Sequence, residues 1–159
     1  KAGRVRQGIL SLPLVAEARV ERRLPWVVRI LVKERTPVAR LADGRGVAAD
    51  GVGFEYPASR LMSLPVAGSE DAARILGGVP PAWRARLRRV DGGKDGVNLE
   101  LVDGTHVVVG AGGTTLAVSL DRLDRVLSDI SRRGLRAESI LLSADGGPVT
   151  VRPRRGRRV

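Results

Sequence analysis

The chain has 159 residues, 43% of them apolar and 28% charged, which suits one soluble domain or two small ones with a buried core. Basic residues outnumber acidic ones by 28 to 17, giving a formal charge of +11, and 25 of the basic residues are Arg. The lack of Cys and the single His exclude thiolate chemistry, zinc-finger ligation and sites with several His ligands, so we expect no metal and no cofactor. No apolar run approaches the roughly 18 residues of a membrane-spanning helix and no signal peptide is visible, while the start at Lys1 suggests a fragment.

The first part of the chain is expected to contain a short helix and two strands. Residues 4–12 favour a helix that ends before Pro13, because the residue preceding a proline is disfavoured in the helical region. Alternation of apolar and polar residues predicts strands at 17–23 and 26–34, separated at residues 24–25. These elements bury little surface alone, so we expect them to lean on the rest of the chain or on further N-terminal residues.

Turn and helix signals divide the remainder into strand pairs and two helices. The dipeptide Asp-Gly, which suits the positive-φ positions of tight hairpins, occurs six times. The strands are expected at 47–54 (a short pair), 97–102, 105–109, 138–143 and 148–152. Helices are predicted at 69–76, with Ser69 as N-cap, and at 119–133, with Ser119 as N-cap. The pattern predicts an α+β fold with a largely antiparallel sheet and two packed helices, not a βαβ winding.

Candidate catalytic groups form no recognisable constellation. His106 lies among valines of a predicted hairpin strand, where a solvent-facing or satisfied histidine is far commoner than a catalytic one. The run 110–115 superficially resembles a phosphate loop but lacks the Gly-Lys-Ser/Thr ending, and the carboxylates are scattered among Asp-Gly turns. We therefore expect a protein without enzymatic activity.

The last predicted strand is the candidate binding site. A terminal edge strand presents a row of unpaired N–H and C=O groups, to which an extended partner segment can add by β-augmentation. Alternation would direct Thr150 and Arg152 towards the partner and the two valines towards the core, while the Arg pair 88–89 would add charge complementarity for an acidic partner. The candidate partner-binding residues are Val149, Thr150, Val151, Arg152, Arg88 and Arg89. An alternative is that Pro148 and the basic tail guard this edge against aggregation.

The C-terminus is basic, since residues 152–159 read RPRRGRRV. Such a composition buries no apolar surface, so residues 153–159 are expected to form a disordered basic tail. The alternative function is a basic nucleic-acid-binding domain that acts through this tail. Single-strand binders stack bases on aromatic side chains, however, and the four aromatic residues of this chain do not cluster, so no nucleic acid is expected as a partner.

Residues 13–41, PLVAEARVERRLPWVVRILVKERTPVARL, carry a series of short motifs. These are P-x-V at Pro13, V-x-R at Val20, a proline at Pro25 and V-x-E-R-x-P-V-A from Val32 to Ala39. The series resembles the FtsQ/DivIB family of bacterial division proteins. The similarity continues at Asp50, Gly51 and Phe54, at Leu64, Pro65 and Gly68, at Val107 to Gly110, and in the closing hairpin at 138–152.

This resemblance implies a single-pass inner-membrane protein whose extracytoplasmic part has a POTRA domain followed by a β domain. Residues 1–41 then resemble the C-terminal part of the POTRA domain and residues 42–152 the β domain; the segments that precede them in the family, including the membrane anchor, would lie outside this chain. The implied function is a divisome scaffold that binds FtsB-like and FtsL-like membrane-anchored proteins and helps to regulate septal peptidoglycan synthesis.

The junction between the two implied domains contains Glu34, Arg35 and Pro37. The first two side chains point to opposite faces of a strand, where either can pair across the sheet, and Pro37 ends the strand. We expect a structural role here, such that a change would alter the orientation of the domains.

Overall fold

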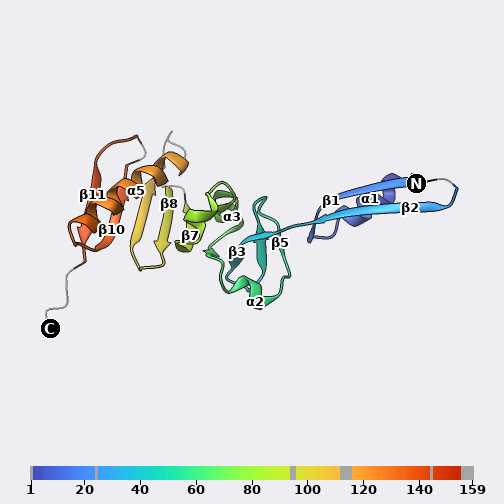
Figure 1. Ribbon diagram of the computed structural model, residues 1–159, viewed down its shortest axis with the longest axis horizontal. Coiled ribbons are helices and arrows are strands. Elements are labelled where there is room, and N and C mark those ends of the chain that lie inside the picture. Colours follow the sequence, from blue (N-terminus) through green and yellow to red (C-terminus); the bar gives the residue numbers. More distant parts are fainter. Residues whose placement is uncertain (1, 24, 94–95, 112–115, 144, 155–159) are drawn as a thin grey trace.

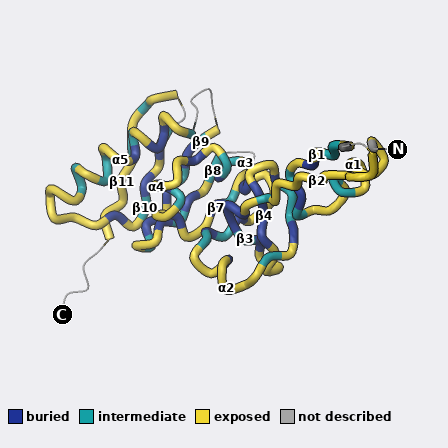
Figure 2. Tube along the Cα trace, turned by 45° about the vertical axis from the view of Figure 1, so that its right-hand side comes forward, coloured by how far each residue is buried: buried dark blue, intermediate teal, exposed yellow. Residues whose placement is uncertain are grey.

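The computed structural model describes residues 2–23, 25–93, 96–111, 116–143 and 145–154, and these form two separate sheets (Figure 1). A narrow arm, residues 2–34, contains a two-stranded sheet and one helix and projects from one end of the molecule. A nine-stranded sheet with its helices forms the rest, and the C-terminal strand lies at the end opposite the arm. Burial is concentrated in the nine-stranded sheet, while the arm is largely exposed (Figure 2).

The arm consists of α1 (Ala2–Leu10), β1 (Val15–Arg23) and β2 (Val27–Glu34), close to the predicted ranges. The two strands pair antiparallel, with Val20 opposite Ile30. Helix α1 packs against β1, where the Nε of Arg6 donates to the carbonyl of Ala18 at 3.0 Å. The helix covers β1 only, because Val15 and Ala18 are buried whereas all eight residues of β2 are exposed.

The nine-stranded sheet has the order β11-β10-β9-β8-β7-β6-β3-β4-β5. Its strands are β3 (Pro37–Leu41), β4 (Gly46–Ala48), β5 (Gly53–Phe54), β6 (Val66–Ala67), β7 (Leu87–Gly93), β8 (Gly96–Leu101), β9 (His106–Gly110), β10 (Ala137–Leu142) and β11 (Val149–Pro153). The helices are α2 (Ala58–Leu61), α3 (Glu70–Gly77), α4 (Pro81–Arg84) and α5 (Leu116–Arg132). The predicted α+β fold with a largely antiparallel sheet is confirmed.

Three neighbouring strand pairs of this sheet are parallel, namely β3–β6, β6–β7 and β9–β10. Parallel neighbours cannot be joined by a tight turn and need a crossover connection. Helices α3 and α4 supply it between β6 and β7, and α5 supplies it between β9 and β10. The sheet therefore contains βαβ connections, and the prediction of a fold without βαβ winding is wrong at these two places. The short β6 is not predicted by the sequence, because two residues are too few for an alternating pattern.

Helix α5 covers one face of β8, β9 and β10. Leu99, Val107 and Ile140 share a buried core with Leu120 and Leu123 of the helix. The alternate strand residues Asn98, His106 and Leu141 point to the other side and are exposed. This second surface, called here the open face, is therefore accessible from β8 to β11.

Local sequence patterns predicted most of the helices and strands, but the structure corrects two predictions. Ser69 caps α3 as predicted, its Oγ accepting from the N–H of Ala72 at 3.1 Å. Ser119 is not an N-cap, because α5 already includes Leu116, whose packing against the core extends the apolar stripe one turn earlier. The change of sheet falls between Glu34 and Pro37 instead of after residue 41, since residues 37–41 are largely buried within the nine-stranded sheet.

The candidate partner-binding edge

Strand β11 is an edge of the nine-stranded sheet, with β10 on one side and no strand of the described chain on the other. The pairing with β10 is antiparallel and places Leu142 opposite Val149 and Leu141 opposite Thr150. In such a pair every second residue directs its N–H and C=O to the neighbour and the remaining ones point outward. The outward groups of β11 are therefore available to an added strand.

The side chains of β11 divide between the two faces. Val149 and Val151 pair with Leu142 and Ile140 on the core side; Val149 packs against the core, and Val151 remains 37% exposed. Thr150 and Arg152 are exposed, and Thr150 lies beside Leu141, which is 50% exposed on the open face. A partner on β11 could thus contact a polar and an apolar side chain together.

Both ends of β11 are held in place from the inner side of the strand. Before it, the guanidinium of Arg122 on α5 donates to the carbonyls of Gly147 and of Ser143. After it, the N–H of Arg154 donates to the carbonyl of Arg136 at 2.8 Å. Strand β11 is therefore fixed without use of its outer edge.

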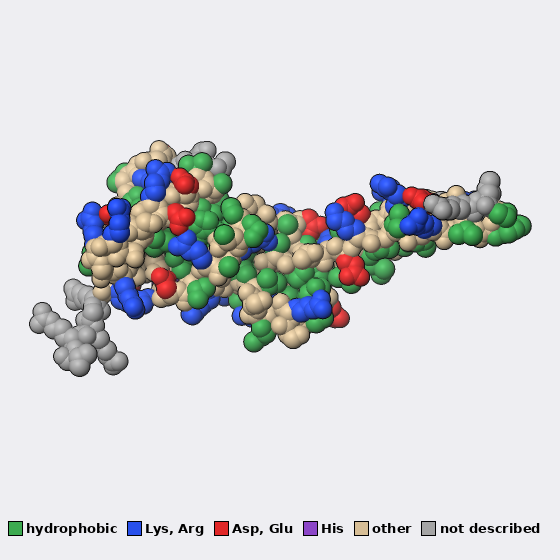
Figure 3. All heavy atoms as spheres, viewed as in Figure 1, with side chains coloured by type: hydrophobic (Ala, Val, Ile, Leu, Met, Phe, Trp, Pro, Cys, Tyr) green, Lys and Arg blue, Asp and Glu red, His purple; other side chains and the backbone are tan. Residues whose placement is uncertain are grey.

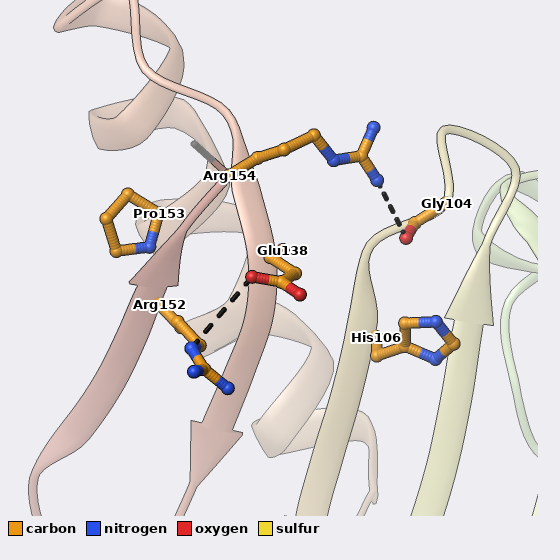
Figure 4. A pocket seen from close by; sticks show the side chains of 6 residues that line it. All are labelled: Gly104, His106, Glu138, Arg152, Pro153 and Arg154. Carbon is orange, nitrogen blue, oxygen red and sulfur yellow. Dashed lines mark hydrogen bonds and ion pairs between the residues drawn. The ribbon is translucent and has the colours of Figure 1, made fainter. Parts of the chain in front are cut away.

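Beside the end of β11 the surface is hollowed into an open pocket of about 800 Å³ (Figure 4). The pocket is lined by Gly104, His106, Glu138, Arg152, Pro153 and Arg154. Arg154 donates to the carbonyl of Gly104 at 3.0 Å, and the Nε of Arg152 lies 3.9 Å from Oε2 of Glu138. The ordered contacts of Pro153 and Arg154 show that the expected tail begins later than residue 153; residues 155–159 lie outside the described residues.

The ion pair between Arg152 and Glu138 is weak, because the two side chains are 76% and 54% exposed. An acidic side chain of a partner would therefore compete with Glu138 for Arg152 at little cost. Sequence reasoning missed Glu138, since its proximity to Arg152 depends on the register between β10 and β11.

Arg88 and Arg89 lie on β7, and β8, β9 and β10 separate them from β11. At the usual spacing of strands this is about 19 Å, so the structure does not bring them to the same edge. Arg88 pairs with Glu100 at 3.3 Å, and Arg89 pairs with Asp91 at 2.6 Å, a contact that raises the pKa of Arg89. They could meet only a partner that continues from β11 across the open face.

Arg35 joins the arm to the nine-stranded sheet. Its Nη1 donates to the carbonyl of Pro13 at 2.7 Å and also to that of Val15, while its Nε lies 2.9 Å from Oδ2 of Asp50, in the turn between β4 and β5. Glu34 ends β2 with an exposed side chain, and Pro37 begins β3. Of the three predicted junction residues, Arg35 is thus the one whose side chain ties the two sheets together.

Asp50 is the acceptor at this junction. Partial burial acts to raise the pKa of its carboxyl, but hydrogen bonds from Arg35 and from the N–H of Val52 outweigh it, so the pKa lies below its ordinary value of 3.8. Sequence reasoning matched Asp50 to a family motif without its partner, because Arg35 lies 15 residues away.

The described residues contain no group of three His, Asp or Glu side chains placed to hold a metal ion. Within the same residues, no helix has the length and apolar character needed to cross a membrane. Of the phosphate-loop-like run at 110–115, residues 112–115 lie outside the described residues.

Comparison with protein-family models gives no match. Among curated proteins, the chain is 29% identical over 154 residues to a cell division protein FtsQ from Allochromatium vinosum. The alignment covers 92% of this chain but only 58% of that relative's length.

Proposed function

We propose that this chain, which is 29% identical to a cell division protein FtsQ, belongs to the FtsQ/DivIB family and acts as a division scaffold without enzymatic activity. We propose further that it binds its partner through the outer edge of β11. The family suggests FtsB-like and FtsL-like membrane-anchored partners, a place on the extracytoplasmic side of the inner membrane, and a role in regulating septal peptidoglycan synthesis.

One observation carries the proposed binding mode: β11 is anchored at both ends from within the molecule, while its outer edge is free of other described strands. An extended segment can pair with that edge without displacing any contact of the fold. Each backbone hydrogen bond contributes only about 0.5–1.5 kcal/mol net, so side-chain contacts must supply much of the affinity. Thr150 and the neighbouring Leu141 offer such contacts on the open face.

Arg152 gives the proposed site a preference for acidic partners. An acidic residue of the added strand would replace Glu138 as its counter-charge. Removal of the Glu138 charge should therefore strengthen binding, and removal of the Arg152 charge should weaken it, each by a few-fold because both side chains are exposed.

The test is a titration of the protein with the extracytoplasmic segment of the FtsB-like protein from the same organism. Thr150→Pro and Val151→Pro each remove one backbone N–H of β11. Successive N–H groups of a strand point to opposite sides, so one of the two substitutions removes a donor from the outer edge and the other removes a hydrogen bond to β10. Circular dichroism and thermal unfolding identify which variant keeps the fold, and that folded variant should bind at least tenfold more weakly.

Charge variants provide the matched comparison. Glu138→Gln should tighten and Arg152→Gln should weaken binding, whereas Arg125→Gln, which removes an equally exposed Arg on α5, should leave it unchanged. Equal binding by all of these variants and by the folded proline variant would contradict the proposal. Binding that is lost only on removal of residues 155–159, and that falls steeply with salt, would instead favour the basic tail.

A further inference from the structure

The outer end of the arm exposes an unusual group of apolar side chains. Trp26, which follows the turn between β1 and β2, is 92% exposed, and Val27 and Val28 are 58% and 54% exposed. Hydrophobic side chains gather at this end of the molecule, far from the nine-stranded sheet (Figure 3). A tryptophan held almost entirely in water at the end of a projecting hairpin has no role in the core of the described chain.

Basic side chains lie directly behind these apolar ones. Arg22 is paired opposite Val28, and Arg29 follows Val28 on β2; both Arg side chains are exposed. Residues 19–29 contain four Arg and a single acidic residue, Glu21, which lies opposite Arg29. The end of the arm is thus apolar at its extremity and positively charged behind it.

We propose that this end, formed by Arg22 and residues 25–29, inserts into the interfacial region of an anionic lipid bilayer. Tryptophan favours that region because its ring is apolar and its N–H can remain hydrated, and arginine binds lipid phosphate while its alkyl stem stays in the apolar layer. At about 3.3 Å per strand residue, Arg29 lies about 10 Å behind Trp26, which matches the depth of the headgroup layer. The inference goes beyond the division role and does not depend on it.

Charge and shape favour a lipid surface over a second copy of this chain. A second copy of the same end would bring two clusters of Arg together, which disfavours self-association. The end is convex and narrow, so a fluid bilayer can surround it. The excess positive charge complements anionic headgroups, each Arg near the surface contributing about a fivefold gain in affinity.

The test is binding of the protein to vesicles of phosphatidylcholine, with and without one-third phosphatidylglycerol, followed by sedimentation and tryptophan fluorescence. Trp26 should shift its emission to the blue and be quenched by brominated lipid, whereas Trp83, only 7% exposed in the core, should not respond. Trp26→Ala should remove the quenched component and weaken binding about tenfold, and Arg29→Gln should weaken it about fivefold.

Met62→Ala is the matched control, because Met62 is 76% exposed and lies next to α2, away from the arm; its binding should equal that of the unmodified protein. A chain ending at Arg154 should also bind fully. The proposal is overturned by a lack of binding, by equal binding to neutral vesicles, by full binding of Trp26→Ala, or by loss of binding when residues 155–159 are removed.

Discussion

Replacement of Arg35 by Ala should loosen the base of the arm. The guanidinium bridges three acceptors from distant parts of the chain, namely the carbonyls of Pro13 and Val15 and the carboxylate of Asp50. Its side chain is only 16% exposed, so water does not readily replace these contacts in the folded protein. The substitution removes all three donors at once.

The expected cost follows from the exposure of the partners. The carboxylate of Asp50 is half exposed, and its pair with Arg35 therefore contributes at most about 1 kcal/mol. Hydrogen bonds from a charged donor contribute about 1.5–3 kcal/mol each; the bond to Val15 is partly buried and the bond to Pro13 is exposed, and two bonds from one nitrogen are not additive. We expect a total of about 2–3 kcal/mol, which corresponds to a roughly 30- to 160-fold increase in local opening.

Amide hydrogen exchange measures this opening directly. The N–H of residue 35 donates to the carbonyl of Leu14 at 2.7 Å and should exchange roughly 30- to 160-fold faster in Arg35→Ala, while amides of β8 and β9 should keep their protection. Lys33→Gln is the control, because that side chain is 70% exposed and its ion pair with Glu17 contributes little. If Arg35→Ala changed exchange in the arm no more than Lys33→Gln does, the three contacts of Arg35 would not stabilise the base of the arm.

Three further predictions concern the body of the fold. Leu123→Ala, at a fully buried position of α5, should lower the free energy of unfolding measured in urea by about 2–5 kcal/mol. Val118→Ala, at a 55% exposed position of the same helix, should change it little. Similar effects of the two substitutions would show that α5 is not packed as described. Ser69→Ala should cost about 1 kcal/mol through loss of the cap of α3, and the exposed Ser131→Ala much less, so equal effects would exclude the cap. The pKa of Asp50 is lowered in the folded chain, so its ionised carboxylate stabilises the fold above pH 3.8, and this contribution is lost as the pH falls through the lowered pKa. The free energy of unfolding of Asp50→Asn should therefore depend less on pH between the lowered pKa and pH 3.8 than that of the unmodified protein. An unchanged pH dependence would contradict the contact between Arg35 and Asp50.

The candidate site was only partly predictable from sequence. Alternation in residues 148–152 predicted a closing strand and its two faces, because the side chains of a strand alternate whatever lies beside it. The separation of Arg88 from β11 and the proximity of Glu138 to Arg152 depend on the order and register of strands distant in the chain. A single sequence carries no local signal for such pairings.

Elements that have a local cause could be predicted from the amino-acid sequence alone. Ser69 caps a helix through a contact three residues away, and Asp103-Gly104 turns the chain between β8 and β9 because Gly104 adopts a φ of 83°. The order of the strands, the crossovers that make some neighbours parallel, and the contact between Arg35 and Asp50 become visible only in the folded molecule. The physical reason is that caps and turns form within a few residues, whereas strand order and the junction follow from burial of a core shared by the whole chain.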